Sequence, residues 1–121
     1  MHAALAQGGF EVFGRERLVA PDLLWSEVAA SLHGLGWRAA IPPQRALEAF
    51  DRFDDAGVQP RRPNRLRHEA WRVADELGWA RTYDAEYVAL ARLLGCRLVT
   101  LDARLRRGAE RMVEVVGPAE L

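Results

Sequence analysis

The chain has 121 residues, with 17 basic and 17 acidic side chains, so its formal net charge is zero. This length predicts a single domain over residues 1–121, and a hydrophobic content of 50% is enough for one core. The neutral balance excludes a strong overall basic field of the kind that attracts nucleic acid. No apolar run approaches the roughly 20 residues that span a bilayer, so we expect no membrane partner.

The single cysteine, Cys96, cannot form an internal disulfide, which is typical of proteins that work in the cytoplasm. It follows Gly95 and precedes an expected strand. We therefore expect Cys96 to be a small buried residue, not a nucleophile.

The first half of the chain predicts two helices flanked by two short strands. The expected elements are a strand at residues 17–21, helices at 23–35 and 42–57, and a weak edge strand at 58–63. Asp22 is placed to cap the first of these helices, and Gly57 ends the second. Before them, residues 1–9 resemble the end of another helix that is stopped by two glycines.

The second half predicts three helices and two strands. The expected elements are helices at residues 65–78 and 83–95, a strand at 97–101, a short helix at 102–108 and a strand at 112–116. Asn64 and Thr82 are placed to cap the two longer helices. Helices that alternate with short apolar strands predict an α/β domain with a mainly parallel sheet.

Three carboxylates stand at junctions where such a sheet places its ligands. Glu27 lies one turn into a helix, Asp84 lies in the first turn of another, and Asp102 follows a strand. Parallel sheets bind ligands beyond the carboxyl ends of their strands, and Mg²⁺ or Mn²⁺ prefers carboxylate oxygens. Each acid also has a purely structural interpretation: a surface residue for Glu27, a favourable charge at a helix N-terminus for Asp84, and an N-cap for Asp102. Spacing alone does not decide between these interpretations.

Other kinds of site are less well supported. His33 and His68 lack zinc-ligand spacing to each other and to Cys96. The sequence contains no glycine-rich phosphate loop and no serine-histidine-aspartate order.

Three segments resemble a known family. They read LVAPDLLWSEVAASL, TYDAEYVALARLLGCRLVTLDARL and VVGPAEL, and together they run from about residue 18 to the end of the chain. In this order and at these separations they resemble PIN-domain proteins of the VapC toxin type. The YDAEYVALA and LVTLD blocks carry most of the specificity.

The resemblance implies a three-layer α/β/α sandwich with a mainly parallel sheet. It also implies a Mg²⁺- or Mn²⁺-dependent endoribonuclease that acts on RNA, usually as a homodimer, and is silenced by a cognate antitoxin protein. By this resemblance Glu27, Asp84 and Asp102 match three acids of the metal site, and Thr100 matches a polar position beside it. Arg104 and Arg106 follow Asp102 and can contact RNA phosphates, although a solvated basic helix face explains them equally well.

One family feature is missing. Chains of this family open with a central strand that ends in a metal-binding aspartate, and no such strand precedes residue 18 here. Glu11 is flanked by Phe10 and Val12 and is not assigned to that role. Loss of the strand would leave its two neighbours unpaired, and loss of its carboxylate would weaken binding of the ion. The retained acids favour a truncated start over a degenerate family member.

Two functions therefore remain open. The first is a metal-dependent endoribonuclease toxin, and the second is a non-catalytic PIN-like scaffold that serves as a dimerisation or partner-binding module. Trp25 shares an apolar helix face and is expected in the core or an interface, while Trp71 can pack in the core or anchor a partner.

Overall fold

A computed structural model of the protein describes residues 17–120. The helix end expected at residues 1–9, and Glu11, lie outside these residues. The chain divides between Pro60 and Arg61 into two compact units. No helix among residues 17–120 combines the length and the apolar character that a membrane crossing requires.

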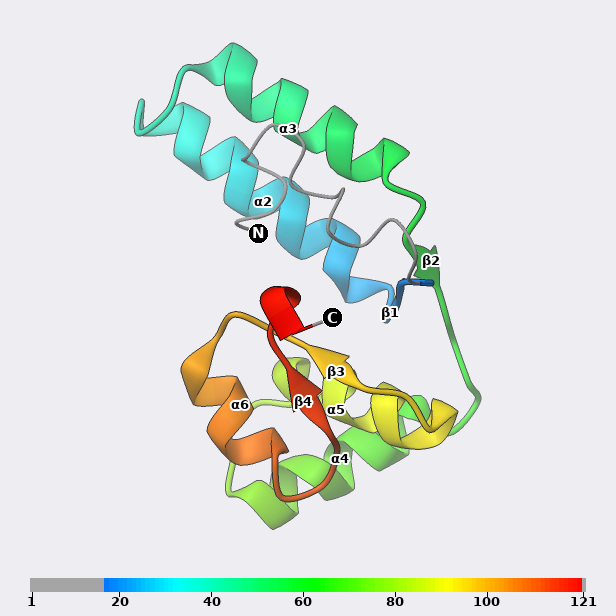
Figure 1. Ribbon diagram of the computed structural model, residues 1–121. Coiled ribbons are helices and arrows are strands. Elements are labelled where there is room, and N and C mark those ends of the chain that lie inside the picture. The colour runs from blue at the N-terminus through cyan, green and yellow to red at the C-terminus, as the bar shows by residue number, and fades with distance from the viewer. Residues whose placement is uncertain (1–16, 121) are drawn as a thin grey trace. The chain divides into compact units, whose positions relative to one another are not determined.

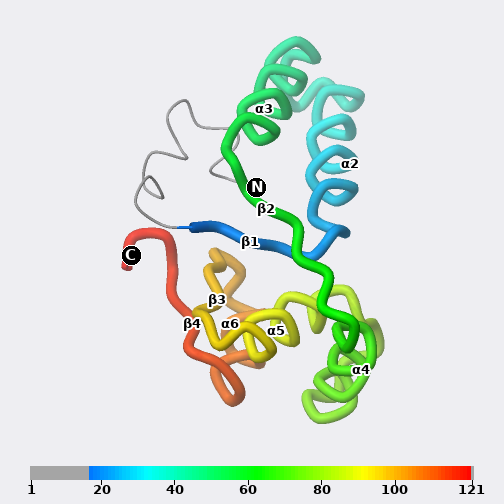
Figure 2. Tube along the Cα trace, turned by 90° about the vertical axis from the view of Figure 1, so that its right-hand side faces the viewer, coloured from blue at the N-terminus to red at the C-terminus, as the bar shows by residue number. Residues whose placement is uncertain are grey.

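The first unit is a helical hairpin flanked by two short strands. In chain order it contains β1 (Val19–Ala20), α2 (Leu23–Trp37), α3 (Pro43–Asp55) and β2 (Gln59–Pro60). Figures 1 and 2 both show α2 and α3 side by side. Their facing sides bury the aliphatic and aromatic residues Val28, Leu32, Ala49 and Phe53. The hairpin is thus held together by its own small core.

The ring of Trp25 contributes to this core from one side. It is partly buried against the cluster, and its centroid lies 5.9 Å from that of Phe53 at a tilt of 57°. Tilted aromatic pairs at this separation are favourable beyond the area they bury. Of the two positions expected for Trp25, the core or an interface, the structure shows packing against the core of the hairpin.

The second unit contains three helices and a second strand pair. The elements are α4 (Leu66–Leu77), α5 (Tyr83–Leu94), β3 (Leu98–Val99), α6 (Ala103–Ala109), β4 (Val115–Val116) and the 3₁₀ turn η2 (Pro118–Glu120). Its core is formed mainly where α4 packs on α5, around the fully buried Val73, Ala85, Val88 and Ala89. Alanine at so many of these positions lets the two helices approach closely.

The strands are parallel, as the sequence predicts. Val19 pairs with Gln59 and Leu98 pairs with Val115 in two separate two-stranded sheets. The α/β class is therefore confirmed, but each strand is only two residues long. Within residues 17–120 the β1–β2 pair belongs to the first unit and the β3–β4 pair to the second.

Helix ends follow the glycine signals better than the predicted caps. Gly78 and Gly95 end α4 and α5 in the left-handed conformation, as predicted. At the other ends, Asp22 and Thr82 occupy the N-cap positions without a side-chain hydrogen bond to the helix. The cap predicted at Asn64 is wrong, because α4 begins one residue later with Arg65 as its N-cap.

The prediction that Cys96 is buried is wrong, and of the two alternatives open for Trp71 the structure excludes packing in the core. Cys96 is exposed, because it lies in the turn between the end of α5 and β3, where its backbone N–H donates to Ala91 O. Trp71 does not pack in the core and is 67% exposed, because the buried face of α4 is formed by its neighbours Leu66, Ala70 and Val73.

Candidate metal centre

Asp102 is held firmly at the end of β3. Its Oδ1 accepts hydrogen bonds from the backbone N–H groups of Arg104, at 2.9 Å, and Leu105, at 3.1 Å. Its own N–H donates to Thr100 Oγ1 at 3.0 Å. In the described part of the chain both carboxylate bonds are made by Oδ1, so Oδ2 is available to a ligand from outside. The N-cap interpretation of Asp102 is confirmed.

Thr100 gives this junction its shape. Because its hydroxyl accepts the Asp102 N–H, the two residues after β3 form a tight side-chain turn. Leu105, which is buried, then anchors α6 to the core of the second unit. Thr100, which the family resemblance matches to a position beside the metal site, therefore helps to orient Asp102.

Asp84 is exposed in the first turn of α5. The next residue, Ala85, is fully buried against α4, and this fixes the backbone at that point. A negative charge is favourable here because the N-terminal end of a helix carries a partial positive charge. Asp84 and Asp102 therefore both belong to the second unit, and both stand at the N-terminal end of a helix.

Glu27 lies on α2 in the first unit, where it is exposed beside the buried Val28. Among residues 17–120, no three histidine, cysteine, aspartate or glutamate side chains form a cluster of the metal-binding kind. Glu27 lies on a different unit from Asp84 and Asp102, and their meeting stays a prediction.

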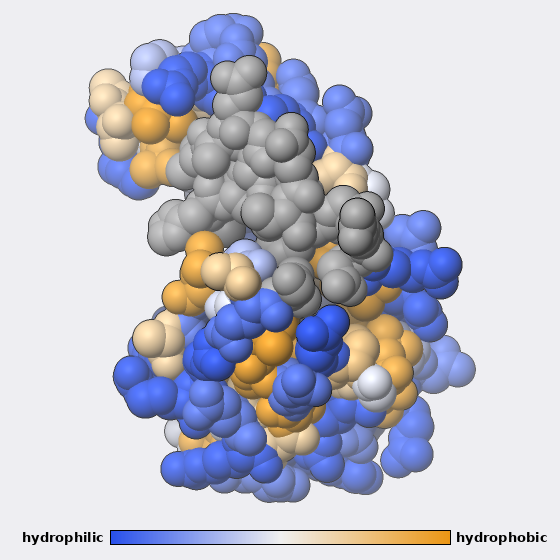
Figure 3. Space-filling model, in the orientation of Figure 1, coloured by the Kyte–Doolittle hydropathy of each residue, from blue (hydrophilic) through white to orange (hydrophobic). Residues whose placement is uncertain are grey.

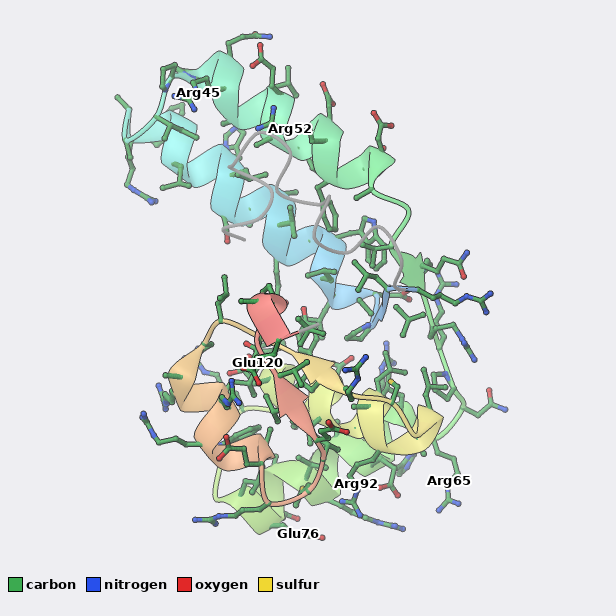
Figure 4. All side chains as sticks on the ribbon, in the orientation of Figure 1. Arg45, Arg52, Arg65, Glu76, Arg92 and Glu120 are labelled. Atoms are coloured by element: carbon green, nitrogen blue, oxygen red, sulfur yellow. The ribbon has the colours of Figure 1, made fainter. Side chains whose placement is uncertain are left out.

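The two arginines predicted to contact RNA differ in their surroundings. Arg104 is exposed in the first turn of α6. Arg106 is half-buried and pairs with two carboxylates: its Nε lies 3.0 Å from Glu110 Oε1, and its Nη1 lies 2.8 Å from Glu120 Oε1. Figure 4 labels Glu120, whose side chain thereby links η2 to α6. An RNA phosphate would have to displace these carboxylates from Arg106, so Arg104 is the better placed of the two.

Glu120 is the titrating member of this network. Its hydrogen bond with Arg106, and then one from the Gly117 N–H, hold the pKa of its carboxyl below the ordinary value of 4.5. The same bond raises the pKa of Arg106. No sequence signal identifies this pair, because its members are 14 residues apart and belong to different elements.

This pair predicts a pH dependence of stability. Because folding lowers the pKa of Glu120, its contribution is fully present above pH 4.5 and is lost as the pH falls through the lowered value. We expect the melting temperature of Glu120→Gln to lie slightly below that of the wild type at pH 7, and the difference to disappear in acid. Thermal melts between pH 7 and pH 3 measure it, with Glu114→Gln, an exposed acid on the same unit, as control. A difference that persists in acid would contradict the assignment.

Comparison with known protein families identifies the fold. A family model described as "PIN domain" matches residues 2–111. The chain belongs to the PIN-domain family. This membership confirms the fold class expected from the sequence, a PIN-like α/β/α sandwich with parallel strands.

Curated relatives narrow the membership to the VapC type. The chain is 37% identical over 103 residues to the VapC ribonuclease Mb0985 of Mycobacterium bovis, with 78% of this chain and 72% of that protein covered. The same figures hold for Ribonuclease VapC9 of Mycobacterium tuberculosis, in strains CDC 1551 and H37Rv. No solved structure matches. The resemblance to VapC-type PIN proteins is thus confirmed.

Proposed function

We propose that this PIN-domain chain is a metal-dependent endoribonuclease, the toxin of a toxin–antitoxin pair. The observation that carries the proposal is the geometry of Asp102, whose Oδ1 caps α6 while Oδ2 makes none of the hydrogen bonds found among the described residues. The similarity to proteins named as VapC ribonucleases supports the same activity.

Glu27, Asp84 and Asp102 are the residues that would hold Mg²⁺ or Mn²⁺. Their donor chemistry fits, because all three are exposed carboxylates and hard divalent ions prefer oxygen ligands. When bound, such an ion polarises a phosphoryl oxygen and lowers the pKa of its water. The chain itself fixes the direction of Asp102 through the Thr100 turn, and Arg104 can bind a flanking phosphate.

The substrate and partners follow from the same proposal. RNA would be the substrate, and a cognate antitoxin protein would block the site until it is removed. We also propose a homodimer that works in the cytoplasm, within a single PIN domain formed by both units.

Titration of Mn²⁺ into the protein tests the metal site. We expect heat of binding from the wild type and none from Asp84→Asn, because the substitution removes a charged ligand without changing the size of the side chain. Asp75→Asn, an exposed acid on α4, is the matched control and should bind like the wild type. Cleavage of RNA by the wild type that disappears in Asp84→Asn would establish the activity. A folded wild type that binds no Mn²⁺ would contradict the proposal.

The second candidate function is a non-catalytic partner-binding scaffold. The observation that favours it is an apolar groove of about 350 Å³ between α2 and α3, lined by residues that include Leu32, Phe50 and the exposed Trp37. Figure 3 shows hydrophobic residues at the loop end of this hairpin. Capture of an antitoxin by a chain that neither binds Mn²⁺ nor cleaves RNA would decide for this function.

A further inference from the structure

The most basic stretch of the chain lies where the second unit begins. Residues 61–72 contain five arginines and one glutamate, a formal charge of +4 in a chain whose total is zero. The glutamate, Glu69, is already paired with Arg72 at 2.9 Å. The stretch thus produces a local positive field that the overall composition conceals.

This charge lies on the N-terminal side of an exposed aromatic ring, and the exposed Asp75, four residues after Trp71, lies on the C-terminal side. Trp71 follows Arg67 by four residues and His68 by three, so the three side chains are neighbours on the surface of α4. Arg67, His68 and Arg72 are exposed, and Trp71 is 67% exposed. Arg65, labelled in Figure 4, is the N-cap of α4 and lies about 9 Å before Trp71 along the helix axis. We call Arg65, Arg67, His68, Trp71 and Arg72 the Trp71 patch.

Trp71 is exposed because the opposite face of α4 is the one that is buried. Leu66, Ala70, Val73 and Ala74 are buried against the core of the second unit. They fix the rotation of the helix, so Trp71 cannot turn inward without exposing them. The exposed indole of Trp71 can stack on a nucleic-acid base. The guanidinium group of Arg67 beside it can bind an adjacent phosphate.

We propose that the Trp71 patch binds single-stranded RNA, with one base stacked on Trp71 and the adjoining phosphates held by Arg65 and Arg67. This deepens the proposed function and rests on it, because it gives the nuclease a substrate-binding surface outside the carboxylate site. The charge complements a phosphate backbone, whereas a protein partner would need a matching acidic surface. Duplex RNA hides the faces of its bases, so the patch favours single strands.

Fluorescence anisotropy with a labelled single-stranded RNA tests the patch. The measurement is made in EDTA on Asp84→Asn, so that neither cleavage nor a metal ion contributes. We expect Trp71→Ala to weaken binding by roughly 5- to 150-fold, the range for one lost base stack. Arg65→Gln combined with Arg67→Gln should reduce the slope of log K against log salt by about 1.4, or ~0.7 for each lost phosphate contact.

The controls are matched in chemistry and exposure. Trp37→Ala removes a tryptophan that is 84% exposed on the first unit, and Arg111→Gln removes an exposed arginine outside the patch. Both should bind like the Asp84→Asn parent. Far-UV circular dichroism checks that the variants fold, and a duplex of the same sequence should bind more weakly than the single strand.

Three outcomes would overturn the inference: equal binding by Trp71→Ala and its parent, equal loss in Trp37→Ala, or a change in oligomeric state without a change in RNA affinity. The last would assign the patch to a protein contact. These outcomes are separable from the proposed function. If the protein binds RNA through the patch but never cleaves it, the inference about the patch stands and the proposed nuclease activity is wrong. If the protein cleaves RNA and Trp71→Ala binds RNA as tightly as its parent, the nuclease activity stands and the inference about the patch is wrong.

Discussion

Asp102→Asn is expected to remain as stable as the wild type and to lose Mn²⁺ binding, with RNA cleavage reduced by roughly 100-fold or more. Asparagine caps helices as well as aspartate does, so the bonds from the Arg104 and Leu105 N–H groups should persist. The negative charge offered by Oδ2 is removed. Mutation of a residue that only hydrogen-bonds to a metal ligand typically lowers metal affinity or activity by about 10- to 100-fold. Loss of a direct ligand should lower them at least as much. Calorimetric titration and a cleavage assay measure the two losses.

Asp102→Ala separates the two roles of this carboxylate. It removes the cap as well as the charge, so it should lose metal binding and also about 1 kcal/mol of unfolding free energy. Urea denaturation of the three proteins measures the difference. If Asp102→Asn were as destabilised as Asp102→Ala, the charge itself would be needed for the cap. If Asp102→Asn cleaved RNA normally, Asp102 would be a structural residue only.

Leu32→Ala is expected to cause the largest loss of stability, about 2–5 kcal/mol. Leu32 is 1% exposed and packs in the cluster that joins α2 to α3. This core is small, so few neighbours can move to fill the cavity. Because whole domains are stable by only ~5–15 kcal/mol, the first unit should unfold at a much lower urea concentration. Far-ultraviolet circular dichroism follows the loss of helix as urea is added.

Leu47→Ala is the matched control for this prediction. Leu47 lies on α3, lines the same groove as Leu32, and is 54% exposed. The same chemical change there should alter stability by less than about 0.5 kcal/mol. Equal effects of the two substitutions would show that the hairpin is not held by its buried leucine.

Much of the fold can be predicted from the sequence because its signals are local. Gly78 and Gly95 end their helices because only glycine enters the left-handed conformation without strain. The strand before Asp102 and the cap formed by Asp102 also follow from neighbouring residues. For the same reason Asp84 and Asp102 can be placed at helix N-termini from the sequence alone.

The features that cannot be predicted depend on the rotation of an element or on distant partners. Trp71 faces water because α4 buries the side that contains Ala70 and Val73, and both sides of this helix contain apolar residues. The Arg106–Glu120 pair depends on where η2 returns to α6. Glu27 lies on a different unit from the two aspartates, so its predicted part in the site cannot be derived from local pattern.

The parallel pairing of the strands has a consequence for the order of folding. Val19 and Gln59 are 40 positions apart in the sequence, whereas Leu98 and Val115 are 17 apart. Closing the longer loop costs about 0.8 kcal/mol more in chain entropy. Neither pair can form as a simple hairpin, because parallel strands need a connecting crossover. The β3–β4 pair, whose connection is mainly the short helix α6, should therefore form before β1 meets β2, which must wait for the α2–α3 hairpin.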